Sequence, residues 1–149
     1  MNYIGTIQYV RCFNVVGAFM RLSEVATLYR PVGPGQLHCI IESGWTRFPE
    51  RKTRQRYFYP MLHESFAKHV AGDWNVRNSG VGYVTRFKVK RTFLEPYPIY
   101  MVGGPEHREY RIDAEYLTQL NSNIVGKIEV IAVFGEPPFS EETGLFAGF

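Results

Sequence analysis

Residues 56–71 read RYFYPMLHESFAKHVA, a pattern that predicts a short aromatic strand running directly into a helix. Side chains alternate along a strand, so Tyr57 and Tyr59 would point to one face and Phe58 to the other. Pro60 cannot donate a ladder hydrogen bond and therefore ends the strand. The apolar residues that follow recur at helical spacing, which predicts a helix that lies on the sheet.

Two tyrosines on one face of a strand, Tyr57 and Tyr59, would form a flat and partly polar platform. A planar ring could stack on such a platform. The alternative is that both rings only pack at the core or its rim, because a domain rich in aromatic residues needs them there.

The composition is that of one globular domain. The chain has 149 residues, 45% hydrophobic and 21% charged, and its aromatic content of 15% together with many Gly and Pro residues favours strands over long helices. A net charge of +3 does not by itself indicate a nucleic-acid-binding protein. No apolar run approaches the roughly 18 residues of a membrane span, so no membrane partner is expected.

The cysteines and histidines do not form a metal-binding or disulfide pattern. Two cysteines are too few for a disulfide framework, and Cys39 is expected to be a buried free thiol on the apolar side of a helix. Free thiols are typical of a reducing compartment, so a cytoplasmic location is expected. The four histidines have no zinc-site spacing, and we expect no metal.

Periodicity along the chain predicts an α+β fold. We expect an N-terminal extension over residues 1–26, a single domain over 27–135 and a C-terminal tail over 136–149. The domain should contain a mixed β-sheet, curved or split, with a few short helices. Strands are predicted over 27–32, 57–59, 82–90, 99–102, 107–112 and 127–134, and helices over 34–43, 62–71 and around 114–124.

A basic loop lies between Arg47 and Arg56. It carries five Lys and Arg residues against Glu50 alone, a local charge of +4. Such a run is usually a solvated loop. Its functional interpretation is a clamp for a phosphate-bearing ligand or a nucleic acid.

The predicted strand 107–112 places His107, Glu109 and Arg111 on one face. A carboxylate is costly to bury without purpose. If the face lines a cleft, its neighbours would tune Glu109, which could then act on a substrate. The alternative is an exposed, charged strand face.

Several of these segments resemble a widespread family of uncharacterised bacterial proteins that carry the label "ADP-ribosylation/crystallin". The resemblance spans roughly residues 27–134. It rests on LYRPVG (28–33), SGW and FP (43–49), FYP (58–60), WN (74–75), GYVTRF (82–87), VGG (102–104), the pattern HxEYxIxAExL from His107 and the pattern NxxIxGxIxV from Asn121.

A looser similarity connects the chain to the ADP-ribosyltransferase fold. Enzymes of that fold use an Arg or His on the first strand, an aromatic or Ser/Thr motif on the second and a Glu on a later strand. Arg30 would match the first, Tyr57-Phe58 with Ser65 the second and Glu109 the third. His107 stands where the arginine-modifying subgroup has a Glu, a difference that argues against transfer to arginine.

This similarity implies a set of roles. Arg30 would hold a pyrophosphate or ribose oxygen, one of the two tyrosines would stack on nicotinamide, and Glu109 would stabilise the positive charge that develops as the glycosidic bond breaks. Thr85, on the neighbouring strand, would support Glu109. The NAD-contacting residues are then expected to be Arg30, Tyr57, Tyr59, Thr85 and His107, with Glu109 as the catalytic residue. Without the resemblance, Arg30 is an ordinary strand-end ion-pair residue, with Glu109 as one partner.

The expected function is therefore that of a nucleotide-binding transferase, a glycosyltransferase that moves ADP-ribose from NAD to an acceptor. Protein, nucleic acid and small molecule all remain open as the acceptor. The alternative is a non-catalytic binding module of the same fold, in which the basic loop contacts a nucleotide or a protein. A 2′-phosphotransferase is disfavoured, because the chain lacks paired His and Arg motifs.

Overall fold

The computed structural model describes residues 24–136, so the expectations for segments 1–23 and 137–149 lie outside the described residues. Val25 and Ala26, which the sequence assigned to the extension, are buried in the first strand. The elements follow in the order β1 (Val25–Val32), α2 (Pro34–Glu42), β2 (Tyr57–Phe58), α3 (Glu64–Val70), the π-helical turn η2 (Ala71–Asn75), α4 (Val76–Ser79), β3 (Val81–Lys90), α5 (Arg91–Leu94), β4 (Ile99–Met101), β5 (Arg108–Tyr110), β6 (Ile112–Asp113), the 3-10 turn η3 (Ala114–Tyr116), α6 (Leu117–Ser122) and β7 (Ile124–Gly135).

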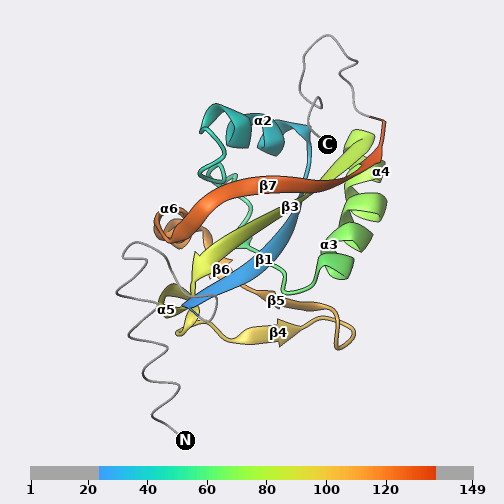
Figure 1. Ribbon diagram of the computed structural model, residues 1–149. Coiled ribbons are helices and arrows are strands. Elements are labelled where there is room, and N and C mark those ends of the chain that lie inside the picture. Colours follow the sequence, from blue (N-terminus) through green and yellow to red (C-terminus); the bar gives the residue numbers. More distant parts are fainter. Residues whose placement is uncertain (1–23, 137–149) are drawn as a thin grey trace, which may run out of the picture.

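The strands confirm an α+β domain with a split sheet. The long strands form a sheet in the order β1-β3-β7, while β2 pairs with β6 and β4 pairs with β5 (Figure 1). Every pairing between the described strands is antiparallel, so the expected mixed sheet is wrong. Only β4 and β5 are joined by a short turn, which favours an antiparallel pair; the other paired strands are joined by long segments that contain helices.

One residue, Met61, joins the long sheet to the β4–β5 pair. Its backbone bridges to Tyr29 of β1 on one side and to Glu109 of β5 on the other. Met61 and Tyr29 exchange two backbone hydrogen bonds of 2.8 Å. Met61 therefore takes the place of a strand between β1 and β5.

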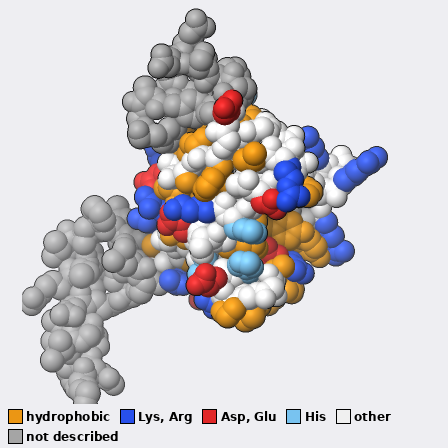
Figure 2. Space-filling view, turned by 90° about the vertical axis from the view of Figure 1, so that its right-hand side faces the viewer, with side chains coloured by type: hydrophobic (Ala, Val, Ile, Leu, Met, Phe, Trp, Pro, Cys, Tyr) orange, Lys and Arg blue, Asp and Glu red, His pale blue; other side chains and the backbone are white. Residues whose placement is uncertain are grey.

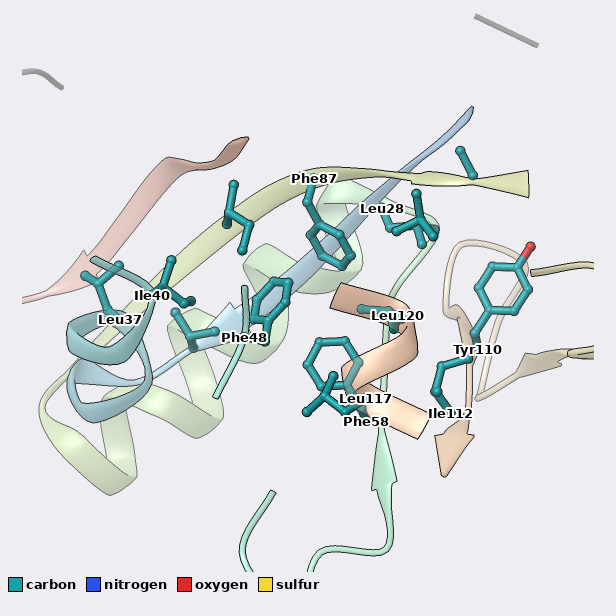
Figure 3. Close-up of a cluster of buried hydrophobic side chains, with 14 of the residues drawn as sticks. Leu28, Leu37, Ile40, Phe48, Phe58, Phe87, Tyr110, Ile112, Leu117 and Leu120 are labelled. Carbon is teal, nitrogen blue, oxygen red and sulfur yellow. The ribbon is translucent and has the colours of Figure 1, made fainter. Parts of the chain in front are cut away.

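The main core lies on one side of the long sheet and is rich in aromatic rings (Figure 3). The ring of Phe48 lies 4.9 Å from that of Phe58 and 4.7 Å from that of Phe87. The alternation predicted for β3 holds only in its second half, where Phe87 is buried between the exposed Arg86 and Lys88, because residues 81–85 are all buried. This alternation directs one face of β3 into the core.

A second, smaller core lies under the helical segment 64–79 and contains Phe66, Ala67 and Ala71 with Met61 and Val84. Figure 1 shows α3 and α4 following one another beside the ends of the long strands.

Two local predictions are wrong. Cys39 is exposed rather than buried, because α2 buries only Leu37 and Ile40. The single strand expected over 107–112 is two strands, β5 and β6, interrupted at Arg111. The interruption follows from pairing, since β5 pairs with β4 while β6 pairs with β2.

Candidate functional site

A cleft of about 1230 Å³ opens at the end of β1. It is lined by the start of α2, the basic loop, the segment joining β2 to α3, the helical segment 64–79 and the end of β5. Arg30, Tyr59 and Glu109 all line it. Three side chains that the sequence placed in one hypothetical site therefore share a cleft.

The residues around Met61 bring these three side chains together. The carbonyl of Pro60 accepts a 2.8 Å hydrogen bond from Tyr110 of β5, while Met61 is bonded to β1. The chain at Tyr59 is thereby held between Arg30 and Glu109. The segment that follows the predicted aromatic strand thus contributes to the site mainly by connecting β1 to β5.

Arg30 is a buried cation with unused hydrogen-bonding capacity. Its side chain is buried, and its guanidinium lies 4.4 Å from the centre of the Phe58 ring. Nη1 donates a 3.4 Å hydrogen bond to the Tyr59 carbonyl, and Nε has no hydrogen-bond partner. Burial, aided by the nearby charge of Arg51, lowers the pKa of Arg30 to about 9, although Tyr59 and Glu109 oppose the shift. Arg30 is thus still charged at neutral pH, and an anion in the cleft would offset the cost of burying it.

Glu109 is also buried, at 7% exposure. Burial raises the pKa of its carboxyl group above the ordinary value, while the hydrogen bond and charge of Arg111 and the charge of Arg30 oppose this rise. Arg111 Nε donates a 3.3 Å hydrogen bond to Glu109 Oε1, and the Arg111 guanidinium lies 4.1 Å from the centre of the Tyr100 ring. The tyrosine and the carboxylate together fix Arg111 at the cleft.

The lining carries a net positive charge. Four Lys and Arg side chains and two Glu side chains contribute, which leaves +2. Of the five basic residues in the loop, only Arg51 and Lys52 line the cleft. Arg51 is anchored by a 3.1 Å hydrogen bond from its Nε to the Tyr57 carbonyl. Two of the loop's five basic residues therefore line the cleft, and the other three are exposed to solvent.

The N-terminus of α2 adds hydrogen-bond donors that the sequence analysis did not identify. Residues 33–36 line the cleft, and Gly33, the N-cap, provides no side-chain hydrogen bond. The first amides of a helix lack intrahelical partners, and those of Gly35 and Gln36 are such groups. An uncapped N-terminus beside a buried arginine favours an anion such as phosphate. The sequence feature that could have indicated these donors is Gly33-Pro34, which begins a helix without a Ser, Thr or Asp residue to cap it.

Three expected site residues do not line the cleft. Tyr57 lies 6.0 Å from the Tyr59 ring, but its own ring faces the Arg56 guanidinium at 5.0 Å. Thr85 is fully buried, and its Oγ1 donates a 2.8 Å hydrogen bond to the Arg30 carbonyl, so it supports Arg30 rather than Glu109.

The third, His107, belongs to a stack of rings that includes Phe66, which itself lines the cleft. Its ring stacks on Phe66 at 4.7 Å and on His69 at 6.1 Å. Figure 2 shows histidine side chains together near the middle of the face on the right of Figure 1. His107 itself does not line the cleft with Glu109, although the two are only two residues apart in the sequence. The cause is local, because His107 precedes β5 at the turn after β4.

Comparison with known proteins gave no match to any family model, curated protein or solved structure. The functional argument consequently rests on the cleft itself. Within residues 24–136, no three His, Cys, Asp or Glu side chains are grouped so that they could hold a metal ion. Over the same residues, no helix is both long and apolar enough to span a membrane.

Proposed function

We propose that the cleft binds NAD and that the protein transfers ADP-ribose from NAD to an acceptor. The observation that carries the proposal is the convergence of Arg30, Tyr59 and Glu109, from three separate segments, on one cationic cleft. Its volume exceeds that of typical drug-sized pockets, about 300–1,000 Å³, so a dinucleotide has room.

Each part of the dinucleotide has a chemically matched group. The pyrophosphate would be bound by Arg30, Arg51 and the free amides of α2, because charged forks and helix N-termini both favour phosphate. The half-buried ring of Tyr59 would stack on the nicotinamide. Glu109 would accept a hydrogen bond from the ribose next to it.

In the proposed reaction, the bond between ribose C1′ and the nicotinamide nitrogen breaks, and its electron pair leaves with nicotinamide. Positive charge then develops on C1′ and the ring oxygen. The ionised carboxylate of Glu109 stabilises that charge without having to reorient, because Arg111 already holds it. The acceptor supplies the electron pair for the new bond to C1′ and releases a proton.

A second candidate is a non-catalytic nucleotide-binding module. It is favoured by the ion pair between Arg111 and Glu109, which occupies one carboxylate oxygen at 3.3 Å. In that role the cleft would use Arg30, Arg51 and Lys52 to hold a nucleotide without breaking it. For either candidate we propose a cytoplasmic location, where the exposed thiol of Cys39 would stay reduced.

Nicotinamide release from NAD tests the proposal. We expect Glu109→Gln to lose about 100-fold or more in kcat, which is the size of effect seen when one preorganised electrostatic group is removed. Glu106→Gln is the matched control, because that residue is exposed on the neighbouring turn and does not line the cleft.

The outcomes separate the two candidates. Equal release by the wild-type protein and Glu109→Gln would remove Glu109 from the mechanism. Binding of NAD without any release by the wild-type protein would favour the binding module.

A further inference from the structure

One part of the cleft wall carries aromatic and amide side chains that have no role in the proposed pyrophosphate site or in the proposed action of Glu109. Trp74 lies on the π-helical turn η2, lines the cleft and is 65% exposed, more than any other large hydrophobic side chain in residues 24–136. An indole ring exposed at a cleft wall offers a flat stacking surface. A π-helical turn within an α-helix is frequent at functional sites.

Polar groups surround Trp74 on the same wall. Asn75, Asn78 and Ser79 also line the cleft. Asn78 Nδ2 donates a 2.7 Å hydrogen bond to the Trp74 carbonyl, which ties the turn to α4. The Oδ1 atom of Asn75 is buried without a hydrogen-bond partner. Amide groups carry both donors and acceptors, as the edge of a nucleobase does.

This wall adjoins the anion site. A Cβ atom placed on Gly33, the N-cap of α2, would lie 3.6 Å from Ser79 Oγ and 3.9 Å from Asn75 Nδ2. Gly33 follows Arg30 by three residues, about 10 Å along extended chain. Arg30, buried and with Nε unpartnered, and the free amides of α2 thus line the same cleft as the Trp74 wall and Glu109.

From this juxtaposition we infer that the Trp74 end is a nucleobase subsite that takes the adenine of the AMP half of the dinucleotide. The inference rests on the proposed function for the identity of the ligand. Trp74 stacks on the base, Asn75 and Asn78 face its edge, and the attached phosphate reaches the start of α2. The opposite end, at Tyr59 and Glu109, then takes the nicotinamide half.

The test measures binding of AMP, nicotinamide mononucleotide and NAD to the full chain by calorimetry. Stacking of one base on an aromatic side chain predicts that Trp74→Ala weakens AMP and NAD binding about 5- to 150-fold. Nicotinamide mononucleotide should bind unchanged. Trp74→Phe should restore most of the affinity for AMP, which a purely structural role would not explain. Tyr116→Ala is the control, because Tyr116 is 43% exposed but does not line the cleft.

Two outcomes would overturn the inference and one would support it. Equal affinity of wild-type protein and Trp74→Ala for AMP overturns it. Unchanged NAD binding in Trp74→Ala, with loss only of transfer to a nucleotide acceptor, also overturns it, because the base would then belong to the acceptor. Loss of AMP binding in Trp74→Ala, in a protein that releases no nicotinamide, supports the subsite and contradicts only the proposed transferase activity.

Discussion

The two buried charges of the cleft have different partners. No ion pair joins Arg30 to Glu109 in the described chain, since Glu109 accepts its hydrogen bond from Arg111. Arg30 instead contacts the Tyr59 carbonyl and the Phe58 ring. A cation that is not neutralised by its nearest carboxylate is available to an anionic ligand, which is what a phosphate-binding role requires.

Removal of Arg111 should change the pH dependence of the reaction. Glu109 must be ionised to stabilise positive charge, and burial already raises its pKa, while Arg111 lowers it. Arg111→Gln removes the lowering effect, so the pKa rises further and the acid limb of kcat/KM moves to higher pH. The measurement is a pH profile of nicotinamide release.

Arg108→Gln is the control for that profile, because Arg108 contacts His63 at 3.2 Å rather than Glu109. An acid limb at the same pH in Arg111→Gln and wild-type protein would contradict the role of Arg111.

Among the secondary-structure elements, the π-helical turn η2 links the sheet to the Trp74 wall. The turn packs closely on the start of β3, and Gly82 permits this approach. A Cβ atom at Gly82 would lie 2.4 Å from the Ala71 carbonyl oxygen and 2.7 Å from Asn75 Cβ. The position of Trp74 therefore depends on the absence of a side chain on a neighbouring strand.

Gly82→Ala should accordingly affect both stability and AMP binding. The clash involves backbone, which cannot rotate away, and overpacking of this kind costs about 1–3 kcal/mol. Displacement of η2 should also weaken AMP binding. Urea unfolding and AMP calorimetry measure the two effects. Gly104→Ala is the control, because a Cβ atom there would meet nothing within 4 Å; equal stability of the two variants would refute the packing argument.

At the scale of the whole molecule, the buried charge of Arg30, which we propose binds an anionic ligand, lowers the free energy of unfolding of the free protein. A small domain has a modest free energy of unfolding, so one buried and incompletely bonded guanidinium is a noticeable cost. Because burial lowers the pKa of Arg30 to about 9, the unfolded chain binds more protons than the folded protein above that pH. The stability contribution of this group therefore rises with pH above about 9, and below it the full penalty applies.

Arg30→Met should raise the stability of the free protein and abolish its response to NAD. An apolar side chain beside Phe58 removes the buried charge, and such replacements stabilise by about 1–4 kcal/mol where the charge is poorly compensated. If the cleft binds NAD as proposed, NAD at 100 times its Kd should add about 2.7 kcal/mol to the wild-type protein, whereas the variant should show no shift. Thermal unfolding with and without NAD measures both effects.

Arg86→Met is the control for this experiment, because Arg86 pairs with Glu129 on the surface and lies outside the cleft. A lower Tm for Arg30→Met without NAD would show that Arg30 stabilises the fold instead.

Sequence periodicity predicted most of the elements. The helix from Pro34, the strand β3 and the helix containing Leu117 and Leu120 are confirmed as elements, because each depends on a repeat visible within about ten residues, although β3 alternates only in its second half. The predictions for Cys39 and for one continuous strand over 107–112 failed. Both depended on which neighbour covers a face or pairs with an edge, information that a local repeat does not contain.

The sequence by itself determined the fold class and the residue types from which a cationic, aromatic site could be built, since alternation, helical spacing and turn residues act locally. Only the tertiary structure decided which side chains share the cleft. Backbone hydrogen bonds of Met61 to β1, and of its neighbours Pro60 and Leu62 to β5, bring Arg30, Tyr59 and Glu109 together, whereas Tyr57 and His107 do not line the cleft. The physical reason is that convergence depends on hydrogen bonds between segments about 30 to 50 residues apart, whose register no single segment specifies.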